Sequence, residues 1–399
     1  MNSIDYSKEN IRFKCAHEVI PAAPKQTETL FAYARWLETN NLLKQDEATY
    51  LEIERLYRIA AESGHFKASK NLQNGSMRKR FHLKGYEHLR LSQQMIETKV
   101  ATGYLLVGYY LQQGSAGLKQ DSEMALRYYQ KAADLGNAEA QAYLADKLAP
   151  INVAPEIALQ LRRCAAEQGH GKTANLLGVH FAVVGRYQEA LEAYQLGVAA
   201  GDDGSAGLLS GGFSGVGSED LLYYIAQPAD PERAARYKKI WKLLSGYSYA
   251  NPKVPEINDI VPLPPAPLPE WDGTLKWVEA RKANIPPEKP SEALINELAK
   301  EKVLDPATGK PLPGSPVFHT ANIPVLTCYS EQPCPKAGYW MMTKYFSPSG
   351  GNARYTQYFE EGQIMPLAMV TYTRPRLWPL SDKVTTFPSG VFWGMFDGP

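Results

Sequence analysis

A short motif of small residues recurs through the first part of the chain and limits what that part can fold into. Its clearest copy lies at residues 128–148 and reads YYQKAADLGNAEAQAYLADKL. Ala132 and Ala133 lie on one helical stripe, Gly136 can end a helix in the left-handed conformation, and Ala140 restarts the stripe after it. The motif therefore predicts a helix, a tight turn and a second helix.

Further copies place marker glycines at Gly64, Gly136, Gly169 and Gly201. The glycines are 33 residues apart from 136 to 169 and 32 apart from 169 to 201. The 72 residues from 64 to 136 leave room for one degenerate copy. A fixed period in the thirties is typical of an α-solenoid, in which stacked helix pairs bury a continuous core.

The motif resembles the Sel-one-like repeat, a relative of the tetratricopeptide repeat, over roughly residues 27–246. This resemblance implies a protein-binding scaffold without chemistry of its own. We expect an N-terminal arm at 1–26, extended or forming a short helix, and a solenoid at 27–250.

A glycine-rich segment at 201–224, GDDGSAGLLSGGFSGVGSEDLLYY, departs from the repeat. Glycine weakens a helix by up to about 1 kcal/mol per residue relative to alanine, so we expect a surface loop here. Loops on one face are where solenoids bind partners, although four acids in a loop can also simply face water. The candidate partner-binding residues in this segment are Asp202, Asp203, Glu219, Asp220, Tyr223 and Tyr224.

The composition changes after the solenoid. Residues 251–270 contain seven prolines, which predicts a semi-rigid extended linker. Beyond it, Ser291 can cap a short helix, and from residue 316 aromatic and β-branched segments such as AMVTYTR predict strands. We therefore expect an α+β protein, in which the α-solenoid precedes a C-terminal α+β domain at 271–399 with a small, mostly β part.

This second half carries its own resemblance. The strings PPAPLPEWDG, PSEALINELA and LDPATGKPLPG resemble the companion module of bacterial Sel-one-like proteins encoded beside type VI secretion phospholipases. Residues from Cys334 to Trp340 and from Arg354 to Pro366 resemble a tail found in polymorphic-toxin immunity proteins. The resemblance implies a periplasmic immunity protein whose partner is a cognate phospholipase effector, with the phospholipase D type most similar. Tyr329 and Tyr339 are candidates for a second contact surface.

Four cysteines bear on the compartment. Cys328 and Cys334 lie close together in a Pro-rich loop, and we expect them to form a disulfide, which requires an oxidising compartment. A zinc site would need two further ligands at suitable spacing, and none is near, so we expect neither a metal nor a cofactor. Cys164 reads as a small buried apolar residue, and the sequence leaves the pairing of Cys15 open.

The sequence offers no convincing catalytic motif. Gly171, Lys172 and Thr173 resemble the end of a phosphate-binding loop, but Ala166 stands where that motif needs glycine and a repeat helix replaces the strand. The sequence contains no Gly-x-Ser-x-Gly elbow. We therefore expect a binding protein and not an enzyme. A solenoid adaptor or chaperone is the first alternative, and an enzyme with its site in the β domain is the second.

The charge balance excludes a global attraction to nucleic acid, since 43 basic and 42 acidic residues give a net charge of +1. A local basic stretch at 67–96 includes Arg78, Lys79, Arg80, Lys84 and Arg90, and it is either a contact face for an acidic partner or phospholipid, or a solvated helix and loop. No apolar run reaches the roughly 18 residues of a membrane span. The start, MNSIDYSKEN, lacks the apolar core of a signal peptide, so a periplasmic location implies a leader absent from this sequence.

Overall fold

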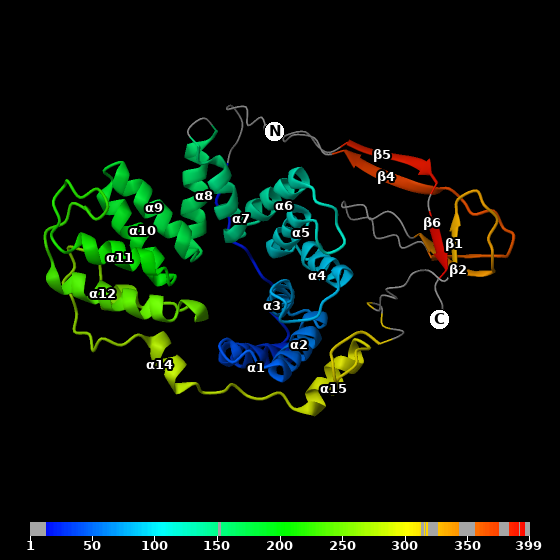
Figure 1. The fold of residues 1–399 in the computed structure, drawn as a ribbon, viewed down its shortest axis with the longest axis horizontal. Helices are drawn as coiled ribbons and strands as arrows, with labels where there is room; N and C mark the ends of the chain where they lie inside the picture. The colour runs from blue at the N-terminus through cyan, green and yellow to red at the C-terminus, as the bar shows by residue number, and fades with distance from the viewer. Residues whose placement is uncertain are drawn as a thin grey trace. The chain divides into compact units, whose positions relative to one another are not determined.

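The computed structural model describes residues 13–150, 153–312, 315, 317, 326–342, 356–374, 383–390 and 392–395. The chain divides into two compact units, Met1–Lys310 and Pro311–Pro399. The first unit is built from paired helices, as the sequence predicts (Figure 1). Among its described residues, twelve long helices follow one another: α1 (Lys25–Asn41), α2 (Glu47–Glu62), α3 (Phe66–Met77), α4 (Gly85–Glu97), α5 (Ala101–Gln113), α6 (Ser122–Asp134), α7 (Ala138–Leu148), α8 (Pro155–Glu167), α9 (Gly171–Val183), α10 (Tyr187–Ala199), α11 (Asp203–Gly212) and α12 (Pro231–Gly246).

The turns between these helices show why the motif contains glycine. Gly64, Gly136, Gly169 and Gly201 all have positive φ, between 83° and 93°. At each turn the residue after the glycine donates its N–H to the carbonyl five residues earlier, for example from Asn137 to Ala132 at 2.9 Å. This arrangement satisfies carbonyls that the end of a helix would otherwise leave unpaired.

The degenerate copy lies at the turn from α4 to α5. Lys99 takes the marker position with φ 61°, and Val100 donates to the carbonyl of Met95 at 2.8 Å. The predicted extra repeat is thus confirmed, and its turn is made without glycine. A lysine in this conformation costs more than glycine would, so the packing of Val100 and Met95 in the core must offset that cost.

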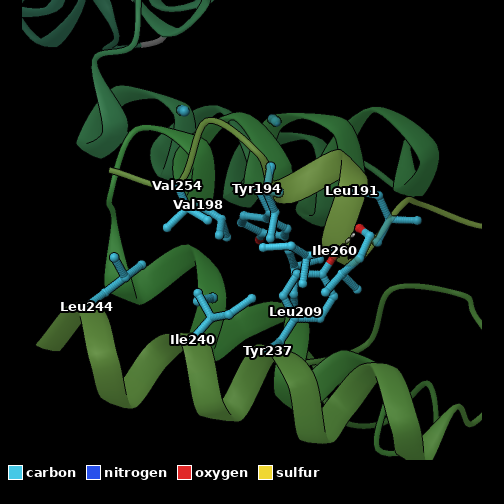
Figure 2. Close-up of a cluster of buried hydrophobic side chains, with 14 of the residues drawn as sticks. Leu191, Tyr194, Val198, Leu209, Tyr237, Ile240, Leu244, Val254 and Ile260 are labelled. Atoms are coloured by element: carbon cyan, nitrogen blue, oxygen red, sulfur yellow. Dashed lines mark hydrogen bonds between the residues drawn. The ribbon is translucent and has the colours of Figure 1, made fainter. Parts of the chain in front are cut away.

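The repeats bury alanine, leucine and tyrosine in a continuous interior. In the middle of the unit, Tyr129, Ala132 and Ala140 are fully buried, and a side chain on Gly108 would collide with the Tyr129 ring. A second cluster joins α10, α11 and α12 through Tyr194, Leu209 and Tyr237 (Figure 2). Each large apolar side chain buried in this way stabilises the fold by about 1.5–3 kcal/mol.

The predicted linker at 251–270 is wrong. Val254 (Figure 2) and Val261 are fully buried against α10 and α12. The Gln195 amide donates to the Val261 carbonyl at 2.7 Å. The Val254 N–H donates to the Ala199 carbonyl at 3.0 Å. The prolines exclude a long helix, but isolated valines and isoleucines between them still reach the core. A 3-10 turn, η1 (Ser248–Ala250), precedes this segment, and a single helical turn, α13 (Ile257–Ile260), forms within it.

The next part of the chain returns to the first helix pair. It contains α14 (Lys276–Ala283) and α15 (Glu292–Glu301). The Asn40 amide donates to the Asn284 amide oxygen at 2.9 Å, and Arg55 reaches Glu292 at 2.6 Å and the Pro306 carbonyl at 2.6 Å. Residues 281–310, hereafter the return segment, therefore belong to the first unit, and the predicted domain boundary at 270/271 moves to 310/311.

The N-terminal arm is extended at residues 13–24 and lies against the repeat turns. A disulfide joins Cys15 to Cys164 of α8, with Cα atoms 5.6 Å apart. Glu18 accepts hydrogen bonds from the Thr102 N–H at 2.6 Å and from the Asn137 amide at 2.8 Å, so its carboxylate lies at the N-termini of α5 and α7. Backbone amides and the helix dipoles favour a negative charge there. Gly136 is doubly required, because any Cβ on it would meet the backbone of the arm.

The described residues of the second unit include six strands. These are β1 (Leu326–Tyr329), β2 (Gly338–Met342), β3 (Thr356–Phe359), β4 (Ala368–Arg374), β5 (Lys383–Ser389) and β6 (Phe392–Met395). An antiparallel sheet has the order β1-β6-β2-β3, and β4 pairs with β5. Trp340, Phe359 and Trp393 form a small buried cluster. Because many of residues 313–399 lie outside the described ones, a small, mostly β domain stays a prediction for the unit as a whole.

The predicted Cys328–Cys334 disulfide is wrong in this structure. Both residues are buried as free thiols, and the Cys328 thiol donates to the Pro333 carbonyl at 3.4 Å. Cys164 is buried as predicted but is paired with Cys15. Closeness in sequence favoured the first pair, whereas the fold brings together two cysteines that are 149 residues apart.

Candidate partner-binding surface

Exposed apolar side chains gather at one end of the last two repeats. Val183 and Val184 lie at the turn from α9 to α10, and Leu221 and Leu222 lie in the loop from α11 to α12. Val183 is 78% exposed and Leu221 is 90% exposed. Large apolar residues that face water in this way mark candidate interaction sites. We call these four residues the apolar patch, and residues 214–230 the contact loop.

The sequence shapes the contact loop through short-range hydrogen bonds. Gly215 turns the chain with φ 87°, and the Asp220 carboxylate accepts from the N–H groups of Leu222 and Tyr223, both at 3.1 Å. The Asp230 N–H donates to the Phe213 carbonyl at 2.9 Å, which closes the base of the loop.

Asp230 also caps α12 through its side chain, which accepts from the Arg233 N–H at 2.9 Å. Burial would raise the pKa of Asp230, but the hydrogen bonds and the charge of Arg233 lower it overall. The base of the loop is therefore held in place by a charged cap.

The two predicted tyrosines fix the loop against the repeats. The Tyr224 ring lies 5.3 Å from the Tyr187 ring, centre to centre, in an edge-to-face arrangement. Tyr223 covers Gly211, where any Cβ would meet its ring. The contact of Tyr187 with Tyr224 brings the contact loop to the α9–α10 turn, so both parts of the apolar patch lie at the same end of the repeats.

The four predicted acids have different surroundings. Asp202 is the N-cap of α11 and accepts from the Ser205 N–H at 2.7 Å, and Asp203 lies within hydrogen-bond distance of the Ser245 hydroxyl. Residues 203–212 form α11, so the prediction of one long surface loop over 201–224 is wrong for this part. Its glycines allow close packing, since a Cβ on Gly212 would meet Ile225. Only Glu219 and Asp220 lie in the contact loop.

The basic groups beside the patch are already paired. Glu189 accepts a hydrogen bond from Arg163 at 3.1 Å and another from Arg186 at 2.6 Å. The Arg186 bond, with help from Arg163, lowers the pKa of the Glu189 carboxyl. Glu189 offsets one of the two guanidinium charges, and together with Glu219 and Asp220 these five groups carry a net charge of −1.

The candidates in the second unit are only partly described. Tyr329 ends β1, is exposed, and lies against Gly390, while Tyr339 belongs to β2 opposite Tyr358. The Tyr339 side chain lies outside the described residues, and both tyrosines stay predictions.

Sequence reasoning predicted the arm but missed how it is attached to the repeats. Cys15, His17 and Cys164 each place one potential metal ligand within 4.8 Å of the others. Because the two sulfur atoms are bonded to each other, they are not thiolates, and the cluster is a covalent link in this structure. A cysteine on each side was visible in the sequence, but nothing local connects them.

Gly171, Lys172 and Thr173 form the first turn of α9, directly after the α8 turn. The Thr173 hydroxyl lies 2.7 Å from the His170 ring nitrogen, so it takes part in the turn itself. Across the described residues, no helix is both long and apolar enough to cross a membrane.

A family model described as "Domain of unknown function (DUF6396)" matches residues 205–312, which begin within α11 and end two residues after the return segment. No match is found among curated proteins.

Solved structures similar to this chain include three from Pseudomonas aeruginosa. PA5086 is 26% identical, with 65% of this chain and 97% of that chain covered and a TM-score of 0.48. Immunity protein Pa5087 is 26% identical, with 64% and 96% covered and a TM-score of 0.47. Immunity protein PA5088 is 24% identical, with 64% and 95% covered and a TM-score of 0.48. Similarity to immunity proteins, which the sequence predicts, is thus found among solved structures.

Proposed function

We propose that the protein is an immunity protein that binds a type VI secretion phospholipase effector and covers its active site. We propose further that this effector is a phospholipase D. The observation that carries this proposal is the apolar patch beside Glu219 and Asp220. A phospholipase D cleft must bind a phosphate group and is therefore basic, and a surface that combines apolar anchors with acids complements it.

The energetics favour a small number of anchoring residues. Leu221 and Leu222 are exposed in the free protein, and burial of each would contribute about 1.5–3 kcal/mol to the complex. The loop that carries them is already held by Asp220, Asp230 and Tyr224, so little ordering cost would oppose binding.

We further propose that the protein acts in the periplasm. The Cys15–Cys164 disulfide supports this location, because such bonds persist in oxidising compartments and are rare in the cytoplasm. Fractionation of cells that express the native gene tests it directly. Recovery of the protein from the cytoplasm, with both cysteines reduced, would contradict the periplasmic proposal.

Titration of a purified phospholipase D effector with the full chain, while its lipase activity is measured, tests the proposed role. Leu221→Asp and Glu219→Lys should each weaken inhibition roughly tenfold or more, since a buried apolar anchor or a desolvated charge is worth about 1.4 kcal/mol or more. Leu43→Asp is the matched control, because Leu43 is 69% exposed at the α1–α2 turn, away from the patch.

The outcomes separate the alternatives. Binding that leaves the lipase active would favour an adaptor or chaperone, and inhibition that neither contact-loop variant weakens would exclude this loop. Asp202 and Asp203 are unsuitable for such a test, because changes there would also remove a helix cap and a bond to Ser245. Tyr329→Ala in the full chain tests the second unit in the same assay.

A further inference from the structure

A hollow lies on the first half of the solenoid, between α3, α5 and α7. Its volume is about 260 Å³. This is slightly smaller than a pocket for a drug-sized ligand and suits a few side chains of a protein segment. We call it the basic hollow, and its walls are Lys70, Asn74, Met77, Arg78, Leu105, Leu106, Tyr109, Gln113 and Glu139.

One wall of the basic hollow carries unpaired hydrogen-bond donors. Lys70, Asn74 and Arg78 follow one another at four-residue intervals along α3 and its C-cap, so they lie on one face of the helix. Within residues 13–150 and 153–312, no carboxylate lies within the 4.0 Å salt-bridge distance of Lys70 or Arg78. Two cations and an amide thus face the hollow without an internal acidic partner.

The other basic residues of this stretch do not line the hollow, and two of them lie beside acids. Arg90 forms two hydrogen bonds with Glu62, one of them 2.8 Å long, and Arg80 lies 4.0 Å from Glu38. The basic face that the sequence suggested therefore shrinks to the residues around the α3 C-terminus. Only Lys70 and Arg78 of this group line the hollow.

The opposite wall and the floor are largely apolar. Leu105 and Leu106 are buried, and the Tyr109 ring is half-buried above them. The Tyr109 hydroxyl donates to Glu139 at 2.6 Å, so the one acid in the lining is held against the α5 wall. Lys70, Arg78 and Glu139 together leave the lining with a net charge of +1. Met77 adds an exposed, adaptable apolar side chain at the rim.

We propose that the basic hollow binds an extended segment of a partner protein in which acidic and apolar residues alternate. Residues four apart on α3 are separated by about 6 Å along the helix axis. Every second residue of an extended chain is separated by about 6.8 Å and points the same way. Such a segment can direct its carboxylates to Lys70 and Arg78 and its apolar side chains to Tyr109 and Met77.

The surface is distinct from the apolar patch, and its charge is of the opposite sign. An acidic segment complements the hollow, whereas the patch complements a basic cleft. The proposal therefore goes beyond the proposed function and can be tested without an effector.

Fluorescence anisotropy with the acetylated, amidated and labelled peptide Glu-Leu-Glu-Leu-Glu tests it on the full chain. We expect binding to the native protein, and roughly a tenfold or greater loss of affinity in the double variant with Lys70→Glu and Arg78→Glu. Lys67→Glu is the matched control, because Lys67 is an exposed lysine on the same helix that does not line the hollow. The control variant should bind the peptide as the native protein does.

Further probes define the chemistry. The peptide Gln-Leu-Gln-Leu-Gln should bind at least about tenfold more weakly, because it cannot pair with the cations. Met77→Ala should weaken binding of the acidic peptide without changing its salt dependence, since that change removes only apolar contact area. Far-UV circular dichroism of each variant shows whether it is folded.

Several results would overturn the proposal. The first is that the acidic peptide does not bind at about 1 mM. The second is that the charge-reversed and native proteins bind it equally. The third is that Lys67→Glu loses as much affinity for the peptide as the double variant does. Retention of phosphatidylglycerol vesicles without peptide binding, abolished by the same reversal, would assign the hollow to a lipid surface. Displacement of the peptide by millimolar inorganic phosphate but not by chloride would reduce the site to a simple anion site.

Discussion

The Cys15–Cys164 disulfide can be tested most sharply by a single substitution. Cys15→Ser removes the bond, and Cys15 is exposed, so the change costs no core packing. The bond closes a loop of 149 residues, from the arm to α8. The chain-entropy relation for a loop of this length gives about 5 kcal/mol as an upper value, and measured bonds contribute about 2–4 kcal/mol. We expect the free energy of unfolding of the first unit to fall by a value in that range.

The arm has a second attachment, and its contribution must be considered beside the first. Glu18 bonds to Thr102 and Asn137, both of which are buried. Hydrogen bonds to a charged group are worth about 1.5–3 kcal/mol, so Glu18→Ala should cost about 2–3 kcal/mol. Because Cys15 and Glu18 hold the same segment, the two losses in unfolding free energy should not add. The double variant Cys15→Ser, Glu18→Ala therefore measures how strongly the two attachments are coupled.

Urea unfolding followed by far-UV circular dichroism is the assay, with and without dithiothreitol. The helical signal comes mainly from the first unit, since the helices among the described residues lie there. Dithiothreitol should destabilise the native protein and the Cys328→Ser control by equal amounts and should leave Cys15→Ser unchanged. A non-reducing digest should yield one linked peptide pair, which contains Cys15 and Cys164.

The opposite pattern would refute the reasoning. If Cys328→Ser abolished the effect of dithiothreitol and Cys15→Ser did not, the bond would join Cys328 to Cys334. Equal unfolding free energies for the native protein and Cys15→Ser would show that the arm contributes nothing to the stability of the repeats.

Three further predictions concern the first unit. Burial lowers the pKa of His88 to about 4 in the folded protein. In the unfolded chain the imidazole takes up a proton near pH 6.5, so acid favours unfolding. The free energy of unfolding should therefore be at its full value above pH 6.5 and fall by about 3 kcal/mol as the pH drops to about 4. In urea titrations, His88→Gln should flatten this dependence, and an unchanged slope would contradict it. Gly169→Ala should lower the free energy of unfolding by about 1–2 kcal/mol, because alanine is strained in the left-handed conformation of this residue. Gly136→Ala should lower it clearly more, because its Cβ would also meet the backbone of the arm. Equal unfolding free energies for the two variants would show that the arm does not lie against Gly136. Arg55→Ala should release Glu292 and Pro306 of the return segment from α2 and speed tryptic cleavage after Lys300 and Lys302, measured by mass spectrometry. An unchanged rate would mean that the segment is held elsewhere.

Much of the first unit could be predicted because its signals are local. Ala132, Ala133 and Gly136 report a helix stripe and its end within a few residues, and their repetition reports the stacking. The same reasoning placed the degenerate copy between Gly64 and Gly136 without identifying Lys99 as its marker. Local reasoning failed at 203–212, where high glycine content suggested a loop. There the glycines make room for Tyr223 and Ile225, so packing offsets the low helix propensity.

The candidate surface was predicted in part for the same reason. Tyr223 and Tyr224 were correctly placed in a loop, but their contacts with Gly211 and Tyr187 depend on how α11 packs against α10. Asp202 looked like a surface acid, and its role as a helix cap follows only once α11 is known. The basic hollow needed three helices to be in place before Lys70 and Tyr109 could be seen to face one space.

By itself, the sequence determined the repeat, its period and the left-handed glycine conformation at each turn, because these depend on residues within one or two helical turns. The tertiary structure alone decided which cysteines pair, that residues 251–270 enter the core, and that the return segment reaches the first helices. Such contacts join residues from about 50 to more than 200 positions apart in the chain, for example Arg55 with Glu292, separated by 237. They form only because packing of the repeats fixes where distant surfaces meet, and no local pattern encodes that distance.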